Sequence, residues 1–413
     1  MCDCHGDFMK KIIRVFSLLL SVICLIILIS GSFAAYLTPD RITVSSDSKI
    51  SFCKFPISMN YSETAVYSDD NKSIHTPGKL MLFGSIPLKE ISVTVSDRLY
   101  AIPGGEPFGI RLYTDGLVVS KTSDIHTADG ICNPSAEAGI KTGDIILSVS
   151  GKKLRTNEQL MTEVENSGGN IIFLECKRGG KKFTAGISPV KDIQLGRYRI
   201  GLWVRDSCAG IGTVTFTDAD TMTFAGLGHG ITDSSSGNIM PLSEGDIVKA
   251  DISSVTKSYG GMPGSLEGYF SDGKAIGSIR ANSECGLYGI LKEKLSDGEK
   301  LPIAFRQEVV RGKAQIRCTV SGSKAEYFDI EIEEISYNNA NITKNMVIKI
   351  TDERLLSKTG GIVQGMSGSP IIQNGRIAGA VTHVFINDPS HGYAIFAENM
   401  AEYNNELIQK TSR

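Results

Sequence analysis

The stretch Gly365-Met366-Ser367-Gly368-Ser369-Pro370 follows an apolar approach at residues 361–364 and leads into the β-like segment Pro370-Ile371-Ile372. The glycines permit turn conformations that other residues avoid, so the loop can expose the Ser367 hydroxyl as a nucleophile. The same turn can direct the amide N–H groups of Gly365 and Ser367 at one point, where they would stabilise an oxyanion. An ordinary Gly/Ser/Pro turn between strands has a similar composition. The rest of the chain therefore has to decide between the two interpretations.

Residues 191–413, which contain this loop, are predicted to form a mainly β domain. Short apolar and β-branched runs alternate with turns, among them Arg199–Val204, Gly212–Phe216, Gln315–Val320, Phe328–Ile335 and Ile377–Phe385. Many short strands with few helices indicate a closed or sandwiched β structure.

Three histidines lie in this domain, and His229 is the best placed to act as a base. It lies at a predicted strand end between two glycines, where an imidazole is accessible to a nucleophile. His383 lies beside Thr382 on an alternating strand, and we expect both residues to line the substrate cleft. A core or edge position for His383 fits the same pattern. His391 lies in a predicted loop near Pro389 and is a poorer candidate for the base.

A carboxylate is expected to orient the imidazole of His229 and to stabilise its protonated form. Asp352 ends a predicted strand and precedes Ser367 by 15 residues. Asp233 and Asp246 are closer to His229 in the sequence. Spacing alone leaves all three open, with Asp352 preferred.

The N-terminal segment, residues 1–40, is predicted to be a cytoplasmic tail followed by a membrane anchor. Residues 15–39 carry no charge, and this run is long enough to span a bilayer as a helix. Lys10, Lys11 and Arg14 precede the run, so the N-terminus is expected in the cytoplasm and the rest of the chain outside. Ser32-Phe33-Ala34 is similar to a signal-peptidase site, so release by cleavage is an alternative.

Composition excludes several classes of function. The chain has 413 residues, 41% of them hydrophobic, and a net charge of -2. It can therefore form two or three domains, but it has no basic excess for binding nucleic acid. Its 9 cysteines include no C-x-x-C pair, and they follow neither a disulfide framework nor a zinc pattern. We expect no metal and no organic cofactor.

A polar spacer at 41–97, with some strands, is predicted to precede a separate domain at 98–190. In this domain a glycine-containing loop leads into the strand at Pro107–Leu112, and a short helical turn covers Pro134–Gly139. The capping box Thr156-Asn157-Glu158-Gln159 begins a helix that extends to about residue 166. This order of elements resembles a PDZ domain.

The PDZ resemblance implies a groove in which an extended peptide adds to the strand after the glycine loop, against the helix. Its ligand would be a peptide C-terminus or a segment of the chain itself, and the N–H groups of residues 108–110 would meet a terminal carboxylate. A groove that packs within the chain and binds no free peptide is the alternative. The residues expected to form the groove are Phe108, Gly109, Ile110 and Leu112 on the strand and Leu160 and Val164 on the helix.

The loop at 365–370 is similar to the Gly-Asp-Ser-Gly-Gly-Pro signature of chymotrypsin-like peptidases. The order of anchor, PDZ domain and C-terminal peptidase resembles the stage IV sporulation protein B family of serine peptidases. The segments that carry this resemblance are Gly226–Asp233, Gly360–Pro370 and Thr382–Pro389.

The family resemblance implies a trypsin-like β-barrel domain in which His229 is the base, Asp352 the orienting acid and Ser367 the nucleophile. It further implies a sporulation endopeptidase in the forespore intermembrane space that also cleaves itself. Its partner would be a membrane-bound regulator of an intramembrane metalloprotease, and cleavage would trigger late sigma-factor maturation. Two positions depart from trypsin: Met366 replaces the aspartate that pairs with a new amino terminus, and Gly361 replaces the specificity aspartate.

Two alternatives differ in class or mechanism. A PDZ-containing, membrane-anchored adaptor with an inactive peptidase-like domain would show no hydrolysis that depends on Ser367. A Ser–Lys peptidase that uses Lys358 would keep most of its activity in His229→Ala. Ser369 is the second candidate for the nucleophile.

Overall fold

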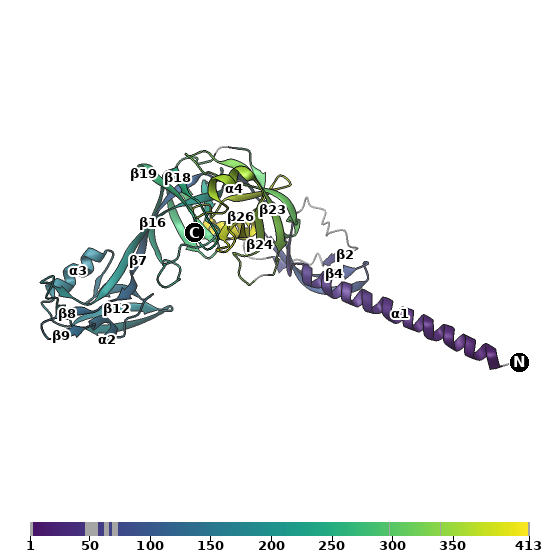
Figure 1. Cartoon of the computed structure of the whole chain (residues 1–413), viewed down its shortest axis with the longest axis horizontal. Helices are drawn as coiled ribbons and strands as arrows, with labels where there is room; N and C mark the ends of the chain where they lie inside the picture. Colours follow the sequence, from purple (N-terminus) through teal and green to yellow (C-terminus); the bar gives the residue numbers. More distant parts are fainter. Residues whose placement is uncertain are drawn as a thin grey trace. The chain divides into compact units, whose positions relative to one another are not determined.

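The computed structural model describes residues 3–45, 57–61, 66–67, 73–296, 298–338 and 340–411 (Figure 1). The chain divides into two compact units. One unit comprises Met1–Leu99, Phe305–Val310 and Ile335–Ala340, and the other comprises Tyr100–Ala304, Arg311–Glu334 and Asn341–Arg413.

The first unit contains the helix α1 (Asp3–Leu37) and a small sheet. Within α1, the 22-residue stretch Ile12–Phe33 has one charged residue, Arg14, and is apolar enough on average and long enough to cross a membrane. The sheet has the order β1 (Arg41–Val44), β5 (Ile86–Ser96), β4 (Ser73–Leu82), β2 (Ile57–Tyr61), and β3 (Val66–Tyr67) pairs with β4. Its core includes Ile42, Leu80 and Val93. The segment predicted as a spacer therefore contains a sheet with its own core.

Six strands of the second unit form a ring, called here the first barrel. Their order is β7 (Pro107–Thr122), β18 (Leu242–Thr256), β19 (Ser265–Ser283), β20 (Gly286–Leu291), β17 (Thr223–Gly226), β16 (Leu202–Thr217), and pairing of β16 with β7 closes the ring. β6 (Tyr100–Pro103) pairs with β16 on one edge and with β21 (Leu301–Pro302) on the other. Phe108, Val214 and Phe224 are buried in the barrel core.

A second closed barrel follows in the chain. Its order is β22 (Gly312–Cys318), β23 (Glu326–Ile335), β24 (Met346–Ile350), β27 (His391–Phe396), β26 (Arg376–Val384), β25 (Pro370–Gln373). The 3-10 turn η1 (Arg306–Glu308) precedes it, α4 (Glu353–Thr359) lies between β24 and β25, and α5 (Ala397–Thr411) follows β27. The expectation of a mainly β, barrel-containing C-terminal domain is confirmed.

Residues Leu117–Val204 belong to the second unit and have a hydrophobic core of their own; they are called here the PDZ-like lobe. Its sheet has the order β13 (Lys181–Ile187), β12 (Ile172–Arg178), β10 (Ile145–Val149), followed by the neighbouring ends of β7 and β16. Short strands β8 (Ile125–Thr127), β9 (Gly130–Cys132), β11 (Lys152–Lys153), β14 (Val190–Lys191) and β15 (Tyr198–Arg199) complete it.

Two helices of the lobe confirm the predicted order of elements. α2 (Pro134–Glu137) is the short helical turn. α3 (Asn157–Asn166) begins at the predicted capping box, in which the Thr156 side chain accepts from the Gln159 amide. Leu160 and Val164 of α3 are buried in the lobe core.

The long strands β7 and β16 run through both the lobe and the first barrel (Figure 1). In the C-terminal half of β7, Leu117 belongs to the core of the lobe. In its N-terminal half, Phe108 and Leu112 belong to the core of the barrel. The predicted domains at 98–190 and 191–413 thus share a continuous pair of strands.

Candidate active site

The nucleophile loop connects α4 to β25 and contains two glycines with positive φ. Gly365 has φ 96° and Gly368 has φ 95°. The Met366 amide donates to the Val363 carbonyl over 3.1 Å, which forms the turn, and the Met366 side chain is buried. A Cβ at position 368 would overlap the carbonyl oxygen of Thr213, so only glycine allows this close approach.

Thr213 of β16 holds the loop by two hydrogen bonds that the sequence did not predict. Its hydroxyl donates to the Gly365 carbonyl over 2.7 Å, and its amide donates to the Ser367 carbonyl over 3.2 Å. Among the described residues, no hydrogen bond uses the amides of Gly365 and Ser367. These two amides remain available to a developing oxyanion.

The hydroxyls of the two candidate serines differ in accessibility. Ser367 is half-buried and its hydroxyl donates to the Thr382 carbonyl over 2.8 Å. Since a hydroxyl has one proton, Ser367 has to rotate away from Thr382 before it can donate to a base. Ser369 is fully buried, and its hydroxyl donates to the Met366 carbonyl over 2.6 Å. Ser369 therefore stabilises the turn.

His229 follows β17 and lines the same cavity as Ser367. Its Nδ1 lies 2.9 Å from the Gly230 carbonyl oxygen. A carbonyl can only accept, so this contact assigns the proton to Nδ1 and leaves the Nε2 lone pair free. Burial lowers the pKa of His229, and the hydrogen bond to Gly230 opposes this shift only in part. The imidazole is therefore held neutral, the form that accepts a proton.

His383 lies beside His229, with ring centroids 4.9 Å apart and planes tilted by 35°. His383 is exposed as a whole residue, and it lines the same cavity as His229. Desolvation is the main cause that lowers the pKa of His383 to about 4, and the electrostatic effects of the neighbouring His229 and Lys344 add to this shift. His383 and Thr382 both line the cavity, where the sequence predicted a cleft wall.

The structure does not bring Asp352 to His229. Asp352 is the N-cap of α4, and its carboxylate accepts from the Arg354 side chain at 2.7 Å and from the amides of Arg354 and Asp329. Arg354 holds the pKa of Asp352 down at about 2. The residue ends a strand as predicted, but a helix follows directly, and the carboxylate accepts from the Arg354 amide in the first turn of that helix.

Among the described residues, none of the other predicted groups forms a hydrogen bond with His229. Asp233 accepts from the amides of Ser235 and Ser236 in its own turn, and Asp246 pairs with Arg111 at 3.9 Å. Lys358 is exposed on α4 and does not line the cavity. Its position does not support a Ser–Lys pair.

The cavity that contains Ser367 and His229 lies between segments of the two barrels and has a volume of about 620 Å³. Ile110, Ile211 and Leu227 come from the first barrel, and Ile362, Val363 and Val384 from the second. Two barrels with a histidine from the first and a serine from the second define the chymotrypsin-like arrangement. Within the described part of the chain, no group of three or more His, Cys, Asp or Glu side chains could hold a metal.

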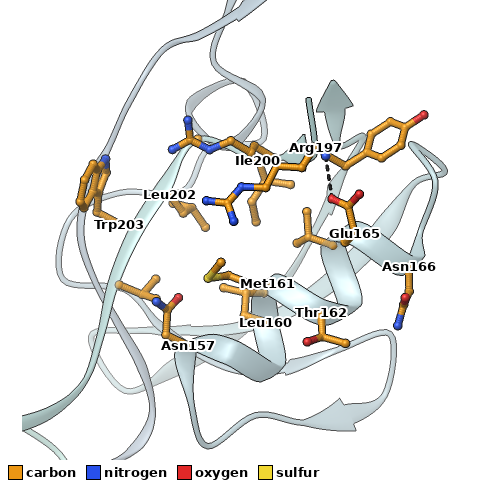
Figure 2. Close-up of a pocket in the computed structure, with 15 residues that line it drawn as sticks. Asn157, Leu160, Met161, Thr162, Glu165, Asn166, Arg197, Ile200, Leu202 and Trp203 are labelled. Atoms are coloured by element: carbon orange, nitrogen blue, oxygen red, sulfur yellow. Dashed lines mark hydrogen bonds between the residues drawn. The ribbon is translucent and has the colours of Figure 1, made fainter. Parts of the chain in front are cut away.

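A second cavity, called here the α3 groove, lies in the PDZ-like lobe between α3 and residues 197–204 and has a volume of about 520 Å³ (Figure 2). Leu160, Met161 and Val164 line it on the helix side, and Ile200, Leu202 and Trp203 on the other side. At residues 202–204, β16 pairs with β7 on one edge and, among the described strands, with no other partner. That free edge faces α3.

The predicted strand side of the groove is wrong, because β7 is covered on both edges over this stretch. Phe108, Gly109, Ile110 and Leu112 pair with β16 on one side and with β18 on the other. They cannot take a further strand. The predicted helix side, Leu160 and Val164, does line the groove.

The glycine turn before the groove strand is at Gly201, whereas the sequence predicted it at Gly109. The φ of Gly201 is 70°, and a Cβ there would overlap the Ser123 carbonyl oxygen. A signal was present, since Ile200-Gly201-Leu202-Trp203-Val204 is also a glycine followed by an apolar strand.

The fold and the site define a chymotrypsin-like serine peptidase with a PDZ-like lobe. The chain belongs to the SpoIVB peptidase S55 family, a family of serine peptidases whose model matches residues 196–401.

Partial similarities to other proteins were also found. A Lactococcus lactis protein named as a zinc metalloprotease is 34% identical over 95 residues, 23% of this chain and 22% of that protein. A Clostridium perfringens protein named in the same way is 31% identical over 70 residues, 17% of this chain and 21% of that protein. The chain thus spans about a fifth of the length of these curated relatives. The crystallised PDZ domain of an SdrC-like protein from Listeria monocytogenes is 22% identical and covers 22% of this chain and 90% of its own, with a TM-score of 0.19.

Proposed function

We propose that this protein is a sporulation serine endopeptidase in which Ser367 is the nucleophile and His229 the base. The observation that supports this most is one cavity lined by Ser367 and by a neutral His229. Within the described part of the chain, Nε2 of His229 and the amides of Gly365 and Ser367 have no hydrogen-bond partner. Ser367 Oγ attacks the scissile carbonyl carbon while Nε2 takes its proton. The proton then passes to the leaving amine, and water hydrolyses the acyl-enzyme by the same route.

The oxyanion formed in each step would accept from the amides of Gly365 and Ser367. Thr213 holds the carbonyls of these two residues, and these bonds attach the loop that carries the two amides to β16. The hydroxyl of Ser367 leaves Thr382 and turns to Nε2 when substrate binds. In this arrangement the Gly230 carbonyl, not Asp352, orients His229.

Hydrolysis of casein by the purified protein tests the assignment. We expect Ser367→Ala and His229→Ala to lose at least roughly 10³-fold in rate, because both act in the same proton transfer. Lys358→Ala serves as the matched control for the Ser–Lys alternative and should remain active. Hydrolysis that survives in Ser367→Ala, or that never occurs in the wild type, would favour the inactive adaptor or another nucleophile.

The proposed location, substrate and self-cleavage rest on the resemblance to the family. We propose that α1 anchors the protein with its catalytic part in the forespore intermembrane space, and that the substrate is a membrane-bound regulator of an intramembrane metalloprotease. Cleavage would trigger late sigma-factor maturation. Intact-mass spectra of purified protein test self-cleavage: truncated species should form in the wild type and be absent from Ser367→Ala. Truncation of both proteins at the same site would indicate a contaminating protease.

We also propose that the α3 groove binds an extended peptide by adding it to the free edge of β16. Arg197 lines the groove, and its guanidinium forms no ion pair within the described residues, so it is available to a terminal carboxylate. Trp203 is the only tryptophan of the chain and lines the groove. Its fluorescence should therefore change when a peptide with a free C-terminus binds, and less so in Arg197→Ala.

A further inference from the structure

Among the described residues that line the cavity around Ser367, none is Lys, Arg, Asp or Glu. Its polar side chains are the two histidines and those of Ser367, Thr382, Thr232 and Gln364. The rest of the lining is apolar or glycine, and the larger apolar members include Ile211, Ile231, Ile362, Val363, Val384 and Ile386. A Lys, Arg, Asp or Glu side chain of a substrate would lose water here without gaining a partner of opposite charge.

Exposed apolar side chains lie at the cavity and on the turn beside it. Tyr259, Met262 and Ile386 are 62%, 67% and 59% exposed. The Gly261 amide donates to the Ile386 carbonyl over 2.8 Å, so the turn at 259–262 lies beside Ile386, which lines the cavity. Exposed apolar side chains that gather beside a cavity indicate a surface for an apolar ligand.

This turn is connected to the segment that leads into the nucleophile loop. The Gln364 amide donates to the Gly264 carbonyl over 2.8 Å, and the Leu266 amide donates back to the Gln364 carbonyl over 2.8 Å. The Ser258 hydroxyl donates to the Ile362 carbonyl over 3.0 Å. These bonds join the segment that carries the turn to the residues directly before the nucleophile loop.

Gly361 begins the segment that forms one wall of the cavity. It is buried, and a side chain at this position would overlap the backbone of Pro389. No carboxylate can be placed there to pair with a Lys or Arg of the substrate.

We infer that the protein cleaves beside apolar residues of its substrate, and that Ile386 on the cavity rim is a specificity-determining residue. The inference rests on the proposed peptidase function. It names the class of substrate sequence: a segment with aliphatic or aromatic side chains next to the scissile bond and no charged side chain there.

A library of quenched-fluorescent peptides that differ only in the residue before the scissile bond tests the inference. We expect kcat/KM to be roughly 100-fold higher for Leu, Ile or Phe than for Lys, Arg, Asp or Glu. Ser367→Ala separates the two claims. If all cleavage survives in that variant, the peptidase assignment fails. If cleavage depends on Ser367 but charged residues are preferred, the specificity inference is overturned.

Cleavage of the same peptide library by Ile386→Glu tests whether Ile386 determines specificity. Being 59% exposed, position 386 can accept a carboxylate without disrupting the core. The variant should lose roughly 10-fold in kcat/KM for Leu and gain for Lys and Arg. Ile193→Glu is the matched control, because Ile193 is 61% exposed and lines neither cavity. An unchanged preference in Ile386→Glu, or an equal change in Ile193→Glu, would overturn the role of Ile386.

Discussion

Asp352 is the residue at which a family-based expectation and the observed contacts differ most. Its carboxylate is used by Arg354 and by backbone amides, whereas Nδ1 of His229 contacts the Gly230 carbonyl. We expect Asp352→Asn to retain activity within about 10-fold of the wild type, since Asn also caps a helix and no triad contact is lost. Casein hydrolysis by a folded variant measures this. A loss of roughly 10⁴-fold would identify Asp352 as the triad acid and require a rearrangement.

Thr213 is a positioning residue for the nucleophile loop. Thr213→Val removes the donor to the Gly365 carbonyl while keeping the side-chain volume, so the loop that carries the oxyanion amides loses one of its anchors to β16. We expect kcat to fall roughly 10- to 100-fold with little change in KM. Thr213→Ser restores the hydroxyl and should recover most of the activity. Equal activity of the Val and Ser variants would show that the hydrogen bond has no catalytic effect.

The pH dependence of activity depends on His229. Burial lowers its pKa, so the imidazole stays neutral, and able to accept the Ser367 proton, at pH values where an exposed histidine is charged. His383, with its pKa lowered to about 4, adds no charge nearby. Hence kcat/KM should remain constant down to below about pH 6.5 and fall only at lower pH. A peptide-hydrolysis profile from about pH 5 to pH 8 checks this, and an acid limb at or above about pH 6.5 would contradict it.

Helix α4 ends at Gly360, directly before the segment that leads to the nucleophile. Gly360 has φ 71°, and a Cβ there would overlap the Ser258 carbonyl. Gly360→Ala therefore combines backbone strain with a clash, and we expect the free energy of unfolding to fall by at least about 2 kcal/mol. Gly196 has φ 68° and open space around it, so Gly196→Ala reports the strain alone. Equal shifts of the denaturation midpoint in both variants would exclude a contribution from the clash.

At the scale of the whole molecule, strand β16 connects the two cavities. Val204 lines the α3 groove, Gly210 lines the active-site cavity, and Thr213 holds the nucleophile loop. A peptide that adds to the edge of β16 in the groove would restrict the same strand that positions Ser367. We expect groove occupancy to change kcat.

One titration can test this connection. A peptide with a free C-terminus is added while Trp203 fluorescence and hydrolysis of a small substrate are followed together. Both signals should change with the same midpoint, and Arg197→Ala should shift both midpoints to higher peptide concentration. A fluorescence change with constant kcat would show that the groove recruits substrate without regulating the site.

The sequence by itself determined the features that depend on short-range constraints. Glycines at 365 and 368 permit the exposed turn around Ser367, and the capping box at Thr156 begins α3. The tertiary structure decided which distant strands pair. β7 and β16 both carry a glycine within an apolar run, and only pairing with β18 shows that β7 is closed at Gly109 while β16 is open beside α3. The roles of Thr213 and Ile386 could likewise not be read from the sequence, because they follow from contacts with residues far away in the chain. The same holds for the hydrogen bond that Asp352 accepts from the Asp329 amide.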